Sequence, residues 1–201
     1  YTRNTTATTT ADITLRGLTI SATGINKVYD GNTNANVTLS DDRVPGDIFS
    51  VNYTSATFDT KDVGTGKIVT VTGITISGPD AYKYTFNNTA TTTADITERA
   101  LSVGATGINK VYDGTTTATV TLSDDGLAGD VLILNYASAN FDTKDVGINK
   151  LVTVTGITVT GADAGNYTWN ATTTTTADIT GAALAVSAAG IDKVYDGNTN
   201  A

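Results

Sequence analysis

Aspartate side chains are the groups in this sequence whose type and spacing could do chemistry. They form two sets related by a step of 83 residues: Asp41, Asp42, Asp47, Asp59 and Asp62, then Asp124, Asp125, Asp130, Asp142 and Asp145. Carboxylates are calcium ligands, and extracellular β modules use weak calcium sites to stiffen their junctions. Because no EF-hand loop pattern surrounds these residues, we expect solvated turn residues and no bound cofactor. Weak structural calcium is the alternative.

The string Tyr-Asp-Gly occurs three times, with its aspartate at Asp30, Asp113 and Asp196. One interpretation is a clasp between neighbouring domains, in which these carboxylates lie near a junction and hold a cation. The other is a tight turn, in which the Asp side chain bonds its own backbone, Gly takes a positive φ and Tyr packs beside it. We expect the turn.

Lysine side chains raise the possibility of an isopeptide bond to Asn or Asp, with Lys27, Lys61, Lys67 and their repeated copies as candidates. Such a bond needs a buried acid to move the protons. The only glutamate, Glu98, is not repeated, so an aspartate would have to serve. Loss of ammonia from the intact mass would reveal a Lys–Asn bond.

The absence of two residue types argues against an enzyme. With no Cys and no His, the sequence has no imidazole base, no Ser-His or Cys-His nucleophile pair and no Cys- or His-bound metal. Paired carboxylates could suggest glycoside hydrolysis, but a hydrolase has no need of its site in every repeat. We therefore predict no catalytic, cofactor-binding or metal-binding residues.

The composition also limits the partners and the location. With 12 Lys and Arg against 20 Asp and Glu, the net charge is −8, which disfavours nucleic acid and acidic membrane surfaces as partners. No apolar run approaches the roughly 20 residues that cross a bilayer. The lack of Cys and the abundance of Thr, Asn, Asp and Gly favour a protein exported by a bacterium.

Internal repetition decides the domain organisation. The string ATGINKVYDG at 22–31 returns at 105–114 and, as AAGIDKVYDG, at 188–197. A period of 83 residues exceeds the roughly 20–50 residues of solenoid repeats and indicates small autonomous domains. The linkers contain no Gly/Ser stretch, which favours a stiff, extended rod.

The repeat also sets the expected boundaries. The predicted parts are the end of a preceding repeat (1–14), two complete repeats (15–97 and 98–180) and the start of a following repeat (181–201). Neighbouring repeats, of the same or of identical chains, are therefore the expected partners.

Within each repeat, short runs of alternating apolar residues predict β-strands. In the segment 68–78 the alternation shifts by one residue at Gly73, and the second repeat shifts in the same way at Gly156. Such a shift exchanges the two faces of a strand, as happens where a strand passes from one sheet to another. We predict an all-β fold of tandem Ig-like β-sandwich domains.

Two further features have structural interpretations. The threonine tracts at 89–93 and 172–176 are predicted to be strands whose threonines face outward. Trp169 occupies the position of Phe86 in the other repeat, so we expect it in the core.

The strings GINKVYDG, VTLSDD, FDTKDVG and TTTADIT resemble the YDG/MBG-type repeat family. These mostly-β modules occur in tandem in long bacterial surface proteins, including filamentous-haemagglutinin-like adhesins. The resemblance implies a non-catalytic structural repeat in the stalk or fibre of an exported adhesin involved in cell adhesion. Any surface ligand would then be bound elsewhere in the full protein.

Two alternative functions remain open. The chain could be the subunit of a self-assembling extracellular filament, in which the flanks 1–14 and 181–201 pair with neighbouring chains by strand addition. It could also be a weak glycan-binding repeat that gains avidity from its copies.

Overall fold

The structure, a computed structural model, describes residues 1–3 and 5–200. Over these residues the regular secondary structure is β-strand, apart from two short 3-10 helices, η1 (Ala81–Lys83) and η2 (Ala164–Asn166). The predicted all-β class is therefore confirmed. The described residues contain no helix long and apolar enough to cross a membrane.

The chain divides into two compact units. Unit 1 comprises Tyr1–Ser102, Asp124–Ile133 and Val159–Asn170, and unit 2 comprises Val103–Ser123, Leu134–Thr158 and Ala171–Ala201. Unit 1 thus contains the whole first repeat together with two segments of the second. The boundaries 15–97 and 98–180 expected from the sequence remain a prediction.

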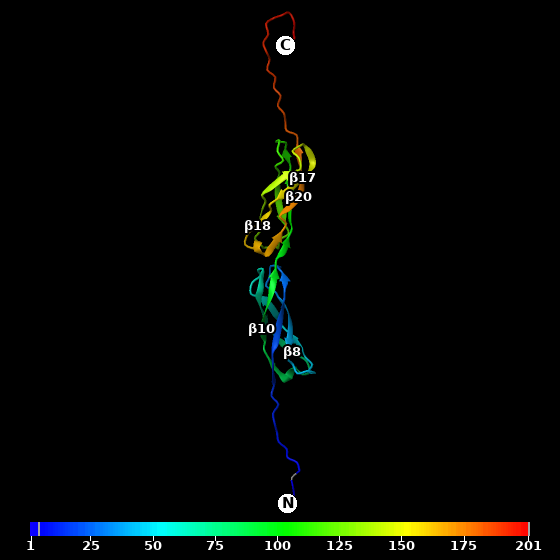
Figure 1. Ribbon diagram of the computed structural model, residues 1–201, viewed down its shortest axis with the longest axis vertical. Helices are drawn as coiled ribbons and strands as arrows, with labels where there is room; N and C mark the ends of the chain where they lie inside the picture. The colour runs from blue at the N-terminus through cyan, green and yellow to red at the C-terminus, as the bar shows by residue number, and fades with distance from the viewer. Residues whose placement is uncertain (4, 201) are drawn as a thin grey trace. The chain divides into compact units, whose positions relative to one another are not determined.

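Unit 1 is built around a four-stranded sheet in the order β3-β10-β7-β6. Its central strand β10 runs antiparallel to β7 and parallel to β3. Two-stranded sheets complete the unit: β2-β4, β5-β8, β1-β9 and β11-β19. The strands are β1 (Arg16–Leu18), β2 (Ile20–Ile25), β3 (Lys27–Val28), β4 (Asn36–Asp41), β5 (Ser50–Asn52), β6 (Ser55–Phe58), β7 (Gly64–Thr72), β8 (Thr75–Ser77), β9 (Tyr84–Phe86), β10 (Thr89–Thr97), β11 (Arg99–Leu101) and β19 (Tyr167–Trp169) (Figure 1).

The alternation of residue types explains this sheet. On β7, Val69 and Val71 are fully buried, whereas the intervening Thr70 is exposed. On β10, Ala94 and Ile96 are buried, whereas the threonine tract before them is exposed or half-buried. Such two-residue periodicity places one face of a strand in the core and the other in solvent. The expectation of outward-facing threonines is confirmed for Thr89, Thr91 and Thr93, whereas Thr92 lies on the same face as Ala94 and is half-buried.

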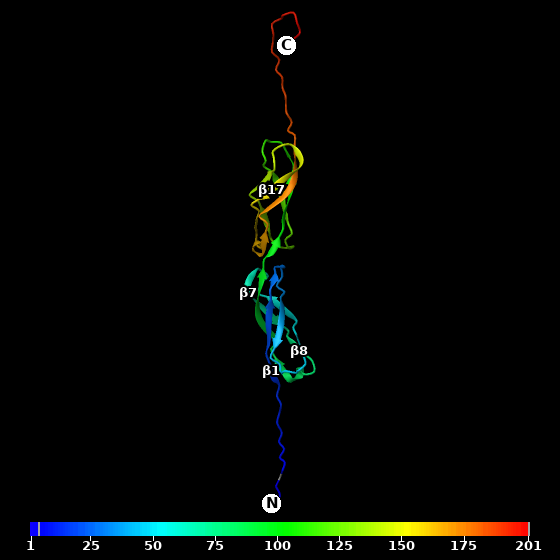
Figure 2. The ribbon, with the colours of Figure 1, turned by 45° about the vertical axis from the view of Figure 1, so that its right-hand side comes forward.

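Gly73 marks the passage of the chain from one sheet to another. The strand β7 ends at Thr72, Gly73 has a φ of 66°, and β8 begins at Thr75 and pairs with β5 instead of β10. Figure 2 labels β7 and β8 on either side of this change. A positive φ is readily adopted by glycine. Because the strands on its two sides pair with different partners, the predicted passage from one sheet to another is confirmed.

Unit 2 repeats the main sheet, in the order β13-β20-β17-β16, beside the pair β12-β14. Val152 and Val154 of β17 are fully buried, as their counterparts are in unit 1, and Gly156 has a φ of 68°. The remaining strands of the second repeat are β12 (Val103–Ile108), β13 (Lys110–Val111), β14 (Thr119–Asp124), β15 (Ile133–Asn135), β16 (Ser138–Phe141), β17 (Gly147–Thr155), β18 (Thr158–Thr160) and β20 (Thr172–Thr180).

The expectation of a core position for Trp169 is wrong. Its side chain is 37% exposed, and Phe86 at the equivalent position of the first repeat is 38% exposed. Both residues end three-residue strands, β19 and β9, in which the first residue is buried and the third is exposed. The buried residues of these two strands are Tyr84 and Tyr167, two positions earlier.

Candidate functional site

Five side chains of unit 1 form a compact cluster in which residues of the first repeat meet residues of the second. The Nζ atom of Lys61 lies 2.7 Å from Oδ1 of Asp163 and 3.1 Å from Oδ1 of Asp130. The phenol of Tyr29 donates to Oδ2 of Asp130 at 2.9 Å, and the phenol of Tyr167 donates to the same oxygen at 2.7 Å. We call these five residues the clasp.

Backbone groups fix one aspartate and the second tyrosine of the clasp. The Val131 amide donates to Oδ2 of Asp163 at 2.9 Å, and the Leu127 amide donates to the Tyr167 phenol oxygen at 3.0 Å. One oxygen of Asp163 is therefore held by its own repeat, and the other receives the Lys61 ammonium. This half of the clasp is a rigid acceptor made of two carboxylates and a phenol.

The other half of the clasp is set by the strands of the first repeat. Tyr29 directly follows β3, and its amide donates to the carbonyl of Thr97 at the end of β10 at 2.8 Å. Lys61 lies in the loop between β6 and β7, with its Nζ 5.7 Å from the centre of the Tyr29 ring. A cation over an aromatic face at this distance is attracted to it, so the two residues act as a pair.

Aromatic packing shields the two tyrosines of the clasp from water. The Tyr29 and Tyr167 rings meet edge to face with centroids 5.5 Å apart, an arrangement that aromatic pairs favour. Tyr29 is 1% exposed and Tyr167 is 2% exposed. Burial of the phenol raises the pKa of Tyr167 to about 12, so both phenols remain hydrogen-bond donors at neutral pH.

The charges of the clasp support one another. Burial alone would raise the pKa of Asp130, but hydrogen bonds from Tyr167, Lys61 and Tyr29 outweigh it and hold that pKa below its ordinary value. The Lys61 ammonium lowers the pKa of Asp163, and Asp163 in turn raises the pKa of Lys61. Condensation to an isopeptide bond needs an uncharged amine, so this arrangement favours an ion pair.

Asn166 closes the clasp on one side. Its side chain is 5% exposed, its Oδ1 accepts from the Val63 amide at 2.9 Å, and its Nδ2 donates to Oδ1 of Asp62 at 3.3 Å. The amide therefore satisfies a backbone donor of the first repeat that would otherwise lose its solvent partner.

The comparisons with known proteins bear on the repeat itself. The YDG domain matches residues 4–94 and again 97–176. The chain belongs to the YDG domain family. It contains two YDG repeats in tandem, and the clasp joins residues that come from both. No curated protein and no solved structure matches the chain.

The Tyr-Asp-Gly string of the first YDG repeat has two separate roles. Oδ1 of Asp30 accepts from the Asn32 amide at 3.2 Å, and Gly31 has a φ of 77°, which confirms the predicted turn. Asp30 also pairs with Lys27 at 2.6 Å. The other interpretation from the sequence placed the Asp of this string at a junction between repeats. The string does reach the second repeat, but through Tyr29 and not through Asp30. The tyrosine in each copy of the string was the available signal.

Most of the other aspartates are engaged locally. Asp41 forms a two-oxygen ion pair with Arg43, Asp42 accepts from the Thr19 amide, and Asp59 pairs with Lys67 at 3.1 Å. Across the part of the chain that the structure describes, no three acidic side chains gather as a metal site. The weak calcium site considered from the sequence remains to be tested.

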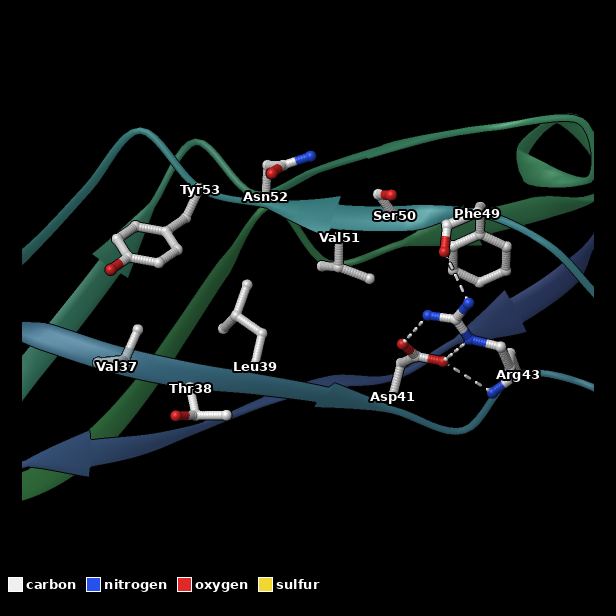
Figure 3. A pocket seen from close by; sticks show the side chains of 10 residues that line it. All are labelled: Val37, Thr38, Leu39, Asp41, Arg43, Phe49, Ser50, Val51, Asn52 and Tyr53. Carbon is white, nitrogen blue, oxygen red and sulfur yellow. Dashed lines mark hydrogen bonds and ion pairs between the residues drawn. The ribbon is translucent and has the colours of Figure 1, made fainter.

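A shallow groove is common to both YDG repeats. In the first repeat it has a volume of about 470 Å³, and Figure 3 shows Leu39 of β4 and Val51 of β5 pointing into it from opposite sides. The ion pair of Asp41 and Arg43 closes one end. In the second repeat the equivalent groove has a volume of about 370 Å³. It is lined by Val120, Thr121, Leu122, Leu134, Asn135 and Tyr136.

Proposed function

We propose that the chain is a non-catalytic structural segment of an exported bacterial surface protein. Its tandem YDG repeats would supply the length of an adhesin stalk or fibre at the cell surface. Each repeat would be an Ig-like β-sandwich, and successive repeats would form an extended rod. The observation that carries this proposal is the clasp, because it bonds side chains of one repeat directly to loops of the next.

The chemistry of the clasp suits a structural junction. Lys61 donates to two carboxylates that the second repeat holds in place, and Tyr29 is buried against Tyr167. Only Glu98 separates β10 from β11, so the covalent link between the repeats is also short. A short linker and a buried polar contact both favour a stiff connection.

Small-angle X-ray scattering tests this proposal on the whole chain. We expect an extended particle in calcium and the same particle in EDTA, because the clasp uses a lysine where a calcium-set junction would use a metal ion. An extended particle that loosens in EDTA would assign the junction to calcium. A compact particle in both buffers would contradict the stalk.

A matched pair of variants tests whether the clasp is responsible for the stiffness that scattering measures. The double variant Tyr29→Phe/Lys61→Met removes the donors of the first repeat, whereas Tyr112→Phe/Lys144→Met changes the equivalent residues of the second. We expect the first variant to show a broader distribution of particle lengths and the second to match the unaltered chain. The same distribution of particle lengths for both variants would show that the clasp does not stiffen the chain.

The shared groove supports a second candidate, a weak binding repeat. Equivalent apolar residues line the groove in both repeats, as with Leu39 and Leu122, so an array of copies could gain avidity. The second repeat cannot form the ion pair that closes the groove of the first, because Gly126 occupies the position of Arg43. Binding of a glycan array by the chain, abolished by Leu39→Asp with Leu122→Asp, would favour this function over the stalk.

A further inference from the structure

The first YDG repeat contains its own copy of the acceptor half of the clasp. The Tyr84 phenol donates to Oδ2 of Asp47 at 2.6 Å, and the Ile48 amide donates to Oδ2 of Asp80 at 2.8 Å. The Val44 amide donates to the Tyr84 phenol oxygen at 3.0 Å. These bonds reproduce, one by one, those that fix Asp130, Asp163 and Tyr167. In the second repeat these residues bind the tyrosine and lysine of the preceding repeat. The acceptor in the first repeat therefore suits a Tyr–Lys pair as its ligand.

A lysine of the same repeat fills this second acceptor. The Nζ atom of Lys83 lies 2.7 Å from Oδ1 of Asp80 and 3.2 Å from Oδ1 of Asp47. Lys61 makes the equivalent contacts in the clasp, at 2.7 Å and 3.1 Å. The Lys83 ammonium therefore occupies the position that a neighbouring repeat's lysine would take.

Position 83 differs between the repeats in a way that matters for this site. The second repeat has Asn166 there, and that amide bonds the incoming Val63 backbone. The Lys83 side chain has no oxygen with which to accept such a bond, and its charge opposes a second lysine at the same two carboxylates. An asparagine at this position therefore completes a junction, whereas a lysine caps the acceptor.

Unit 2 contains the matching donor pair. Lys144 Nζ lies 3.2 Å from the Tyr112 phenol oxygen and 5.6 Å from the centre of its ring, close to the 5.7 Å between Lys61 and Tyr29. Tyr112 is half-buried and Lys144 is exposed. The Tyr–Lys pair thus keeps its geometry in both repeats.

We propose that Asp47, Asp80 and Tyr84 form an acceptor surface for the Tyr–Lys pair of a further YDG repeat. Lys83 caps this surface until such a pair displaces it. The inference deepens the structural role proposed above and rests on it. The residue at position 83, or at its equivalent in another repeat, would set the strength of the junction.

An extended chain tests the inference. A copy of residues 98–180 inserted between Thr14 and Leu15 places its lysine 69 residues before Asp47, the separation found between Lys61 and Asp130. The inserted copy has an asparagine at position 166, so Lys83 remains unique in the chain. Its accessibility is measured by brief reductive methylation and mass spectrometry of the peptide that contains it.

The incoming lysine should release Lys83. We expect Lys83 to be methylated roughly two- to fivefold faster in the extended chain than in the unaltered chain, as suits the loss of a surface ion pair. A control insertion carrying Tyr112→Phe and Lys144→Met should leave the rate unchanged. Equal rates in all three chains, or an equal rise with the control insertion, would overturn the proposal.

The same labelling separates this inference from the function on which it rests. In the unaltered chain, Lys61 should react more slowly than Lys144, because only Lys61 is held by two carboxylates in the clasp. Slow methylation of Lys61, with a methylation rate of Lys83 that the insertion does not change, would overturn the capping role and leave the clasp intact. Equal reactivity of Lys61 and Lys144 would contradict the clasp itself.

Discussion

The phenol of Tyr29 donates to the carboxylate of Asp130, which lies 101 residues further along the chain, at 2.9 Å. The side chain of Asp130 is 5% exposed, and it also accepts from Tyr167 and Lys61. One carboxylate therefore gathers donors from both YDG repeats. A buried charge with several donors is stable, but the removal of one donor leaves it short of partners.

Tyr29→Phe should lower the free energy of unfolding of unit 1 by about 1–3 kcal/mol, because Asp130 loses a buried donor. Urea unfolding followed by circular dichroism reports both units, and the fluorescence of Trp169, the only tryptophan, assigns the change to unit 1. Tyr112→Phe is the matched control, and we expect it to change the stability by less than about 0.5 kcal/mol. Equal effects of the two substitutions would contradict a special role for Tyr29.

Lys61 and Asp163 should act as a coupled pair. Lys61→Met leaves two carboxylates without their ammonium, and Asp163→Asn removes one of the charges that hold it, so the double variant should be more stable than the sum of the single losses predicts. Urea unfolding of the four chains in the cycle measures the coupling. The corresponding cycle on Lys144 and Asp80 is the control, and strict additivity of Lys61 and Asp163 would argue against their contact.

The clasp should weaken in acid. Asp130 and Asp163 have folded pKa values below the ordinary 3.8, so they contribute stability that is present above that value. This contribution is lost as the pH falls through the folded pKa. Unfolding free energies measured between pH 7 and pH 2 should show the loss below about pH 4.

The Asp130→Asn/Asp163→Asn variant isolates the share of the clasp in that acid transition. Its stability should fall less than that of the unaltered chain below about pH 4, since other depressed carboxylates, such as Asp41 and Asp113, contribute equally to both chains. Parallel curves for the two chains would show that the clasp does not titrate in this range. On the alkaline side the raised pKa of Lys61 predicts stability up to about pH 10.

Gly24→Ala should destabilise unit 1 through crowding. A Cβ atom at Gly24 would meet the carbonyl oxygen of Thr93 and lie 2.8 Å from the Cβ of Ala94, both on β10. Overpacking of this kind costs about 1–3 kcal/mol. Gly17→Ala is the control, because no atom lies within 4 Å of its added Cβ. Thermal unfolding compares the two, and an unchanged melting temperature for Gly24→Ala would refute the close approach of β2 and β10.

The strand content of the fold could be predicted from the sequence because its signals are local. Alternation at Val69 and Val71 and the shift at Gly73 each depend on a few adjacent residues, and both predictions are confirmed. The position of Trp169 was predicted wrongly because the sequence shows the equivalent residue, Phe86, but not that β19 ends at Trp169 and leaves it 37% exposed.

The clasp could not be predicted in the same way, because its partners are brought together by the fold. Lys61 was considered from the sequence as an isopeptide candidate, and Asp130 as a turn residue, without any signal that joined them. Repetition obscures such a signal, since every residue of the clasp has a copy 83 positions away and the sequence does not say which copies meet. Position 83 is one of several positions that differ between the repeats, a lysine in the first and Asn166 in the second, and nothing in the sequence marks it out.

The parallel pairing of β3 with β10 has a mechanical consequence. The strand β3 lies near the start of the first repeat and β10 ends it, and Lys27 and Val28 pair in parallel with Ile96 and Thr97. A tensile force pulling the two ends of the repeat apart would load these hydrogen bonds in shear, so that they must break together and not one after another. β13 and β20 of unit 2 pair in the same sense, so each repeat would resist stretching at the parallel pair that its last strand forms.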